Sequence, residues 1–369
     1  MKKNITIVTL NDPENYGNRL QNYALMQMLR RYGTVYTAFC AGFRPLPACI
    51  ARVFHPGVQW IKRILSGIRR GNLLVRIRHH RKCVSFTKHY VPDSYESIDV
   101  INGVRPSKHI TDWYVFGSDQ IWNYHSVQNK DRLRCFALYL GSFLPFQSKA
   151  LSYAASIGVS SEPSTAVQGM FKKYLPNFAA ISVREFRGKE IIQQMTGLRA
   201  DVVLDPTLML SSEQWLKITE GFVPESDRYV LTYFLGHPSE EQEKLIQEYA
   251  HQHGYRIRRI LDLRDSETYI AGPQDFVELF AKAQYVFTDS YHACCFSIIF
   301  RRQFTVYNRS GFRTTRNMNS RMDTLSQLFE LESVVRESGL APHIDYDRVG
   351  SLLRKYQCHS QQWLDSAMA

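Results

Sequence analysis

The segment TDSYHACCFSIIF, residues 288–300, places an imidazole where it could bind an anion or move a proton. Residues 285–287 before it are typical of a buried strand, because aromatic and β-branched side chains suit an enclosed pleated surface. Asp289 or Ser290 can cap a helix that begins near Tyr291. His292 then lies in the first turn, where outward N–H groups and the helix dipole favour anions. The alternative is that His292 only caps or packs.

Short apolar runs alternate with helical patterns along most of the chain, and nearly every run ends in a glycine or a polar cluster. This βαβ order predicts an α/β protein with two doubly wound, parallel-sheet, Rossmann-like domains that face each other across a cleft. Ligands bind at the carboxyl ends of such strands. The clusters at those ends comprise residues 15–18, 117–120, 156–158, 184–185, 205–206, 272–273, 289–292 and 308–309.

The length of 369 residues favours two domains rather than one. We expect an N-terminal α/β domain at residues 1–210, with a basic helical insertion at about 45–90. A C-terminal α/β domain should follow at residues 225–335, after an irregular seam. Residues 336–369 should form a helix that packs back on the first domain.

The net charge of +12 is concentrated near the N-terminus. From Asn15 through Pro92 there is no Asp or Glu, while the window holds fourteen Lys or Arg residues. Residues 58–82 are the most basic part, and Trp60 lies on the apolar face of a predicted amphipathic helix there. Such a helix suits an anionic membrane surface, although a solvated helix packed on its own domain is the alternative. Without a zinc-finger spacing or an RNA-binding strand signature, we expect no nucleic-acid partner.

The cysteine pattern argues against a disulfide framework and against a zinc site. Seven cysteines are an odd number, and none of them forms a CxxC pair. Reduced thiols are typical of a cytoplasmic protein. No apolar run reaches the roughly 18 residues that a membrane span needs. In MKKNITIVTL at the start, the apolar stretch covers only residues 5–10 and no small-residue cleavage site follows, so we interpret it as a strand rather than a signal peptide.

Seven segments, in the same order along the chain, together resemble the polysaccharide pyruvyl transferase family over about residues 1–330. They are NYGNRLQNYAL (15–25), FGSDQIWN (116–123), SYAASIG (152–158), ISVRE (181–185), VVLDPTLML (202–210), GP (272–273) and TDSYHACCFSIIF (288–300). The family's fold is similar to that of GT-B glycosyltransferases. The resemblance implies transfer of a pyruvyl group from phosphoenolpyruvate onto two hydroxyls of a sugar, which forms a cyclic ketal. The sugar would belong to a surface polysaccharide or its lipid-linked oligosaccharide precursor. Ala293 stands where the family commonly has Gly.

This chemistry requires groups that bind the phosphate and carboxylate of the donor, a group that transfers protons, and groups that hold the two sugar hydroxyls. His292, Arg184 and Asp119 are the predicted catalytic residues. Arg offers a planar fork for phosphate or carboxylate, and His can act as a cation or an acid near neutral pH. Donor binding is assigned to Arg184, His292, Ser290, Tyr291 and Arg321, and acceptor binding to Asn15, Asn18, Gln21 and Gln120. No metal or other cofactor is expected, since guanidinium groups can bind the anion.

Structural alternatives compete with several of these roles. Arg184 could form a surface ion pair with Glu185 or Glu190, Asp119 could cap a helix, and Asp205 could serve an Asp-Pro turn. At the level of function, a GT-B-fold glycosyltransferase that uses a nucleotide-sugar is the main alternative, and a non-catalytic assembly factor is the other. For the enzyme we expect a cytoplasmic location, peripheral at the inner face of the plasma membrane.

Overall fold

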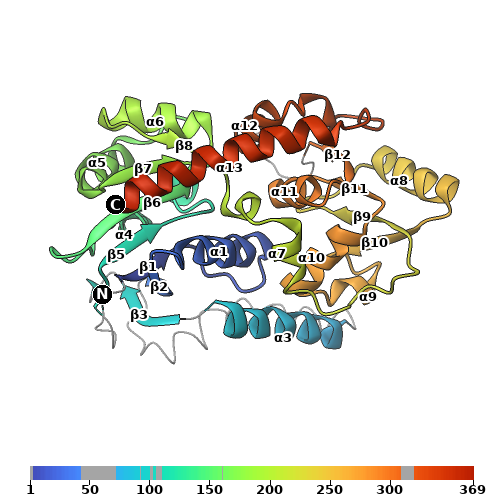
Figure 1. Ribbon diagram of the computed structural model, residues 1–369, viewed down its shortest axis with the longest axis horizontal. Coiled ribbons are helices and arrows are strands. Elements are labelled where there is room, and N and C mark those ends of the chain that lie inside the picture. The colour runs from blue at the N-terminus through green and yellow to red at the C-terminus, as the bar shows by residue number, and fades with distance from the viewer. Residues whose placement is uncertain are drawn as a thin grey trace.

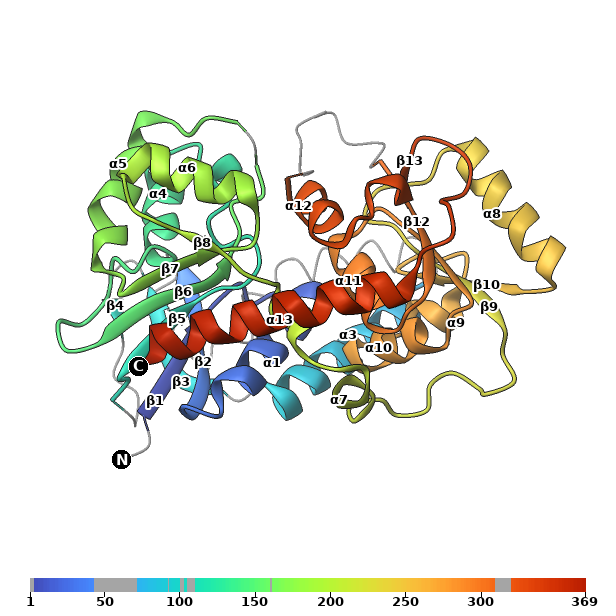
Figure 2. The ribbon, with the colours of Figure 1, turned by 45° about the horizontal axis from the view of Figure 1, so that its top comes forward.

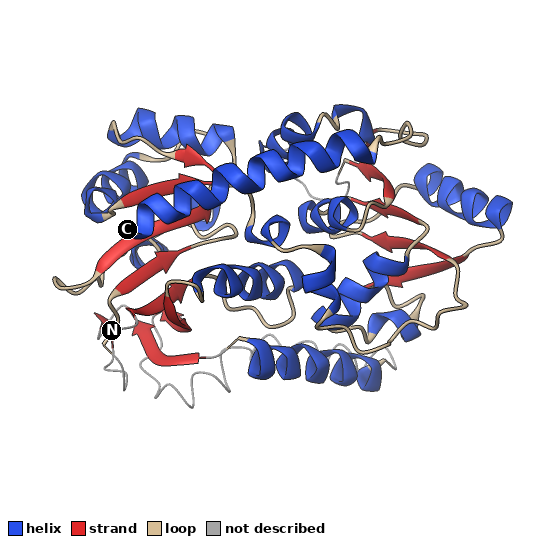
Figure 3. Cartoon of the chain, in the orientation of Figure 1, coloured by secondary structure: helices blue, strands red, loops and turns tan. Residues whose placement is uncertain are grey.

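The computed structural model describes residues 3–42, 72–91, 93–99, 103–104, 110–159, 161–308 and 320–369. Two β-sheets organise these residues, one in each half of the chain, with helices packed around them (Figures 1 and 3). None of the helices in these ranges has the length and apolar character that crossing a membrane requires. The part of the predicted basic helix at residues 58–71 lies outside the described residues.

The first sheet has the strand order β4-β3-β2-β1-β5-β6-β7-β8, and the order reverses at β1. All pairs are parallel except β3 with β4. The strands are β1 (Lys3–Val8), β2 (Gly33–Gly42), β3 (Asp93–Asp99), β4 (Gly103–Val104), β5 (Trp113–Phe116), β6 (Lys149–Ala155), β7 (Ala180–Val183) and β8 (Asp201–Val202). Its helices are α1 (Tyr16–Leu29), α3 (Leu73–Tyr90), η1 (Tyr124–Ser126), α4 (Lys130–Leu138), α5 (Thr165–Tyr174), η2 (Leu175–Asn177), α6 (Phe186–Thr196) and η3 (Pro206–Met209).

The second sheet has the order β10-β9-β11-β12-β13 and is parallel throughout its described strands. The strands are β9 (Tyr229–Tyr233), β10 (Arg256–Ile260), β11 (Tyr285–Thr288), β12 (Gln303–Tyr307) and β13 (Val335–Arg336). The helices are α7 (Ser212–Leu216), α8 (Glu240–His253), α9 (Ser266–Tyr269), α10 (Pro273–Lys282), α11 (Tyr291–Ile299), α12 (Ser320–Phe329), η4 (Glu332–Val334) and α13 (Tyr346–Met368). The prediction of two doubly wound, parallel-sheet domains is therefore confirmed.

Helix α1 joins the two sheets through an apolar core, and every residue of it except Gln27 is buried. The Tyr16 ring stacks on Phe276 of α10 with centroids 4.8 Å apart. Trp215 of α7 lies between Tyr23 of α1, at 5.6 Å, and Phe296 of α11, at 5.0 Å. Because one apolar cluster contains residues of both sheets, their relative orientation is fixed by packing rather than by a linker alone.

Two further helices connect the domains on opposite sides, α13 along the top of Figure 1 and α3 along its lower edge. The α13 helix starts beside the second sheet and ends beside the first (Figure 2). Ser360 Oγ of this helix accepts from the Leu204 backbone N–H at 2.9 Å, and Lys3 Nζ donates to the Met368 carbonyl at 2.8 Å. On the other side, Lys82 of α3 binds Asp275 of α10 at 2.7 Å. These contacts add to the apolar core around α1 in joining the two domains.

Candidate active site

One carboxylate, that of Asp205, brings together the two residues on which the predicted chemistry depends. Arg184 follows β7 in the first sheet, and its Nη1 donates to Asp205 Oδ2. His292 lies in the first turn of α11 in the second sheet, with Nε2 3.8 Å from the same oxygen. Both side chains are buried. The structure therefore brings Arg184 and His292 together from different domains, as expected, while their catalytic roles stay predictions.

Asp205 is held by a dense set of donors. Its Oδ1 accepts from the Thr207 backbone N–H at 2.9 Å and from Thr207 Oγ1 at 2.7 Å, and Ser118 Oγ lies 3.3 Å from Oδ2. Burial alone would raise the pKa of Asp205, but Arg184, His292 and Thr207 outweigh it, so the pKa is lowered. Asp205 thus stays charged at neutral pH. It serves the predicted Asp-Pro turn and, beyond that prediction, the ion pair with Arg184.

Arg184 makes its ion pairs inward, with Asp205 and, at 3.4 Å, with Asp119. Burial alone would lower the pKa of Arg184, but the two carboxylates outweigh it and the pKa is raised. The alternative of a surface pair with Glu185 or Glu190 is wrong for this structure. Glu185 accepts from backbone N–H groups in the loop after β6, and Glu190 pairs with a different arginine.

A second buried guanidinium, that of Arg321 on α12, lies beside the first. The two guanidinium carbons lie over the Tyr291 ring, Arg184 at 4.6 Å and Arg321 at 5.5 Å from its centroid. Gln120 Oε1 accepts from Arg321 Nη2 at 2.6 Å in the amide orientation that satisfies both groups. Burial and Arg184 lower the pKa of Arg321 to about 10, so it stays charged at neutral pH. Within the described ranges no carboxylate lies within ion-pair distance of Arg321, which leaves a buried cation able to bind an anion.

The N-terminus of α11 has the predicted form. Ser290 is the N-cap residue, but its side chain makes no capping hydrogen bond. Asp289 instead accepts from the backbone N–H groups of Leu235 at 2.7 Å and Gly236 at 2.8 Å. Nine buried side-chain polar atoms in the described part of the chain have no hydrogen-bond partner, and two of them, His292 Nε2 and Arg184 Nε, belong to the residues that share Asp205. Unpartnered buried polar atoms are rare in proteins, and a group of them indicates a place for a polar ligand.

The His292 ring is packed directly against the backbone of α1. A Cβ added at Gly17 would lie 2.1 Å from His292 Nδ1 and 2.5 Å from Cε1, far inside van der Waals contact. Burial is the main cause of a lowered pKa for His292, and Arg184 and Arg321 add to it while Asp205 and Asp119 oppose it. The imidazole is therefore neutral at pH 7 in the unliganded protein. Gly17 falls within one of the family-like segments, but its type and position gave no sign of this contact.

The residues predicted to bind the acceptor form hydrogen bonds with one another and with their neighbours. Asn15 Oδ1 caps α1 by accepting from the Asn18 N–H at 3.1 Å, and Asn18 Nδ2 donates to Asp119 Oδ2 at 2.6 Å. Gln21 Oε1 accepts from the Ser118 N–H at 3.0 Å. Burial would raise the pKa of Asp119, but Arg184 outweighs it and the pKa is lowered, which makes this carboxylate a weak base. No helix begins directly after Asp119 for it to cap. Roles in acceptor binding and proton abstraction stay predictions.

The sequence profile of the polysaccharide pyruvyl transferase family matches residues 15–311. The chain belongs to this family. The matched span contains Arg184, Asp205 and His292, whereas Arg321 lies beyond its end. No curated protein sequence matches this pyruvyl transferase homologue.

Solved structures of sugar-processing enzymes align with the family member over nearly its whole length. The UDP-GlcNAc 2-epimerase from Methanocaldococcus jannaschii is 10% identical with a TM-score of 0.49, covering 96% of this chain and 92% of its own. A putative UDP-N-acetylglucosamine 2-epimerase from Listeria monocytogenes is 10% identical with a TM-score of 0.48, covering 98% of this chain and 91% of its own.

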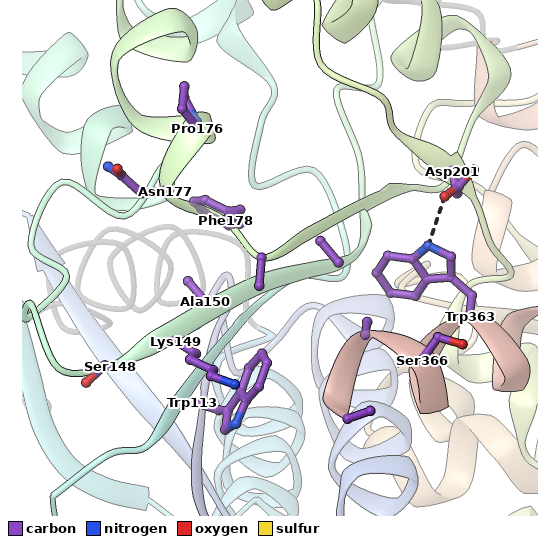
Figure 4. Close-up of a pocket in the computed structure, with 14 residues that line it drawn as sticks. Trp113, Ser148, Lys149, Ala150, Pro176, Asn177, Phe178, Asp201, Trp363 and Ser366 are labelled. Carbon is purple, nitrogen blue, oxygen red and sulfur yellow. Dashed lines mark hydrogen bonds between the residues drawn. The ribbon is translucent and has the colours of Figure 1, made fainter.

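A cavity of about 750 Å³ lies at the opposite end of the first sheet from Arg184. Trp113 and Lys149, at the starts of β5 and β6, line it together with Asp201 and Trp363 (Figure 4). The Trp363 indole N–H donates to Asp201 Oδ2 at 3.1 Å, which holds α13 against β8. None of the predicted site residues lines this cavity, so it is separate from the candidate active site.

Proposed function

We propose that this protein transfers the pyruvyl group of phosphoenolpyruvate onto two hydroxyls of a sugar, forming a cyclic ketal and releasing phosphate. The sugar belongs to a surface polysaccharide or to its lipid-linked oligosaccharide precursor. Family membership supports a pyruvyl transferase. The observation that carries the donor assignment is the buried Nε2 of His292, which lies beside two guanidinium groups and has no hydrogen-bond partner among the described residues.

The arrangement suits a small donor that carries a phosphate and a carboxylate. Arg184 is paired with Asp205 and Asp119, whereas Arg321 has no ion-pair partner among the described residues, so Arg321 is the guanidinium left to bind the donor. His292 gives its proton either to the methylene carbon of the donor or to the leaving phosphate. A buried site strengthens both interactions, because little water screens the charges.

The reaction balances without an oxidant or reductant. A proton bonds to the methylene carbon, positive charge develops at the adjacent carbon, and one sugar hydroxyl bonds there. The bond from that carbon to the phosphate oxygen breaks, and the second hydroxyl closes the ring. The two hydroxyl protons account for the new C–H bond and for the proton on the released phosphate.

The direct test measures phosphate release from phosphoenolpyruvate across a panel of hexopyranosides with neighbouring free hydroxyls. We expect release only with a suitable acceptor, and a product heavier than that acceptor by one pyruvic acid less one water. Turnover of a nucleotide-sugar with no phosphate release across the panel would favour the glycosyltransferase alternative. Full cellular function of variants lacking both His292 and Arg184 would favour the assembly-factor alternative.

Replacing Gly17 with Ala should lower the turnover number by roughly tenfold to a hundredfold, because small displacements of a catalytic group are costly. The new Cβ would occupy space within 2.1 Å of His292 Nδ1, so the ring or α1 must move. Donor binding through Arg321 should change less than turnover. Initial rates with varied phosphoenolpyruvate separate the two quantities.

Gly169→Ala is the matched control, since a Cβ at that position of α5 would meet nothing within 4 Å. It should leave the kinetics unchanged and add up to about 1 kcal/mol of helix stability. Equal kinetics for Gly17→Ala and Gly169→Ala would show that the ring is not positioned by α1.

A further inference from the structure

The outward face of α3 carries a basic stripe, which we define as Leu74, Arg78, Arg81 and Lys88. All four are exposed, Leu74 to 70%. Their spacings of four, three and seven residues place them on one face of a helix with 3.6 residues per turn. The stripe extends over roughly 21 Å at 1.5 Å per residue. Helix α3, which carries the stripe, runs along the lower edge of the molecule in Figure 1.

The opposite face of α3 already has partners. His79, Cys83 and Phe86 are buried, and Lys82 binds Asp275 of the second domain at 2.7 Å. By contrast, no carboxylate in the described ranges lies within ion-pair distance of Arg78, Arg81 or Lys88. The helix thus uses its inner face to join the domains, and the charges of the stripe have no carboxylate partner among the described residues.

We propose that this stripe docks the protein on an anionic lipid bilayer. A flat surface of lipid phosphates complements a straight row of cations, and each Lys or Arg close to such a surface contributes to binding. The exposed Leu74 can enter the headgroup region. The absence of any Asp or Glu between Asn15 and Pro92 removes the repulsion that an acidic neighbour would cause.

The middle of α3 contacts Glu14 and the first residue of α1, which lead to the candidate active site. His80 Nδ1 lies 2.7 Å from Glu14, and His79 Nδ1 lies 3.5 Å from the Tyr16 hydroxyl. Gly17, the next residue, packs against His292. Docking through the stripe would therefore hold the site close to the membrane, where a lipid-linked acceptor diffuses. This last step rests on the proposed function, whereas lipid binding itself does not.

Vesicle sedimentation of the full chain, without donor or sugar, tests the proposal. We expect binding to vesicles of phosphatidylcholine with phosphatidylglycerol, little binding to phosphatidylcholine alone, and loss of binding at about 0.5 M salt. The triple variant Arg78→Glu, Arg81→Glu, Lys88→Glu should bind at least about a hundredfold more weakly. Its thermal unfolding and its activity on a soluble acceptor should match the unchanged protein.

The control variant is Lys172→Glu, Lys173→Glu, Lys189→Glu, which reverses three exposed charges on α5 and α6. This variant changes the net charge by the same amount as the stripe variant. Its affinity for the vesicles should stay within a few-fold of that of the unchanged protein. Equal losses in both variants would assign binding to overall charge and overturn the proposal. Retained binding in the stripe variant, or binding to duplex DNA but not to vesicles, would overturn it as well. Vesicle binding with no pyruvyl transfer would instead refute only the proposed function.

Discussion

Replacing Asp205 with Asn should destabilise the protein by about 3–5 kcal/mol, the usual cost of removing one partner from a buried ion pair. Asp205 is fully buried and accepts from Arg184, Ser118 and Thr207. Asn keeps the shape and one acceptor oxygen but removes the charge. Arg184 then remains buried with Asp119, 3.4 Å away, as its nearest counter-charge. Urea denaturation of both proteins measures the difference in the free energy of unfolding.

Glu162→Gln provides the matched control. Glu162 pairs with Arg187 on the surface, with its own side chain 69% exposed. Exposed pairs contribute at most about 1 kcal/mol, because water and salt screen them. A loss for Asp205→Asn no larger than that for Glu162→Gln would mean that the buried pair is not what stabilises this region.

The pH dependence of the Asp205 contribution has a defined sign. Its pKa is lowered on folding from an ordinary value of 3.8, since the ion pair outweighs burial. The contribution is therefore fully present above about pH 4 and is lost as the pH falls through the folded pKa. The difference in stability between the unchanged protein and the Asp205→Asn variant should stay constant from about pH 5 to 8 and narrow only in acid. A difference that disappeared near neutral pH would contradict a lowered pKa.

The elements that the sequence predicted well are those with a strong local pattern. The strand predicted at residues 285–287 lies within β11, and the helix predicted to begin near Tyr291 begins there. Both segments are apolar and buried, so their composition reflects their surroundings directly. The polar strand β3, DSYESID, was missed because its sequence lacks an apolar run.

Helix α3 shows why local pattern is insufficient. The sequence predicted a basic helix over residues 58–82, and among the described residues helix α3 runs over Leu73–Tyr90. Its buried positions are few, and His79 and Lys82 are fixed by residues about 190 positions away in the second domain. Such tertiary contacts determine much of helix stability in proteins, and they leave no periodic signal in the sequence.

The candidate site also has features that the sequence predicted and features that it did not. Strand ends placed Arg184 and His292 at a common edge, because ligand sites of parallel sheets occur there. The role of Asp205 as their shared partner depends on three chain segments that meet only after folding. The contact of Gly17 with the His292 ring likewise depends on the exact approach of α1. Spacing within one segment cannot encode either of these features.

Replacing His292 with Gln should lower the turnover number by about 10²–10⁴-fold, the usual contribution of a positioned acid or base. Gln is polar and of similar length, so the packing against Gly17 is largely kept, but it cannot transfer a proton. Affinity for phosphoenolpyruvate should fall less than turnover, because Arg321 and Arg184 remain. Initial-rate kinetics with both substrates varied give the two effects separately. His359→Gln, at an exposed position on α13, should leave both unchanged.

The proton balance of donor binding gives the sharper test of the same residue. Burial, Arg184 and Arg321 lower the pKa of His292, so the free protein holds a neutral imidazole at pH 7. The negative charge of bound phosphoenolpyruvate should raise the pKa of His292 and favour the imidazolium, so binding should be accompanied by uptake of a proton. The value of kcat/KM for phosphoenolpyruvate should then fall by up to about tenfold for each pH unit above neutrality.

Calorimetry in two buffers of different ionisation enthalpy counts the protons taken up on binding. The unchanged protein and His359→Gln should take up a fraction of a proton that His292→Gln lacks, which separates the imidazole from the donor's own phosphate. Equal uptake in all three proteins would place the proton on the donor. His292 would then act by orientation alone, and the acid would have to be sought among the other groups around Tyr291.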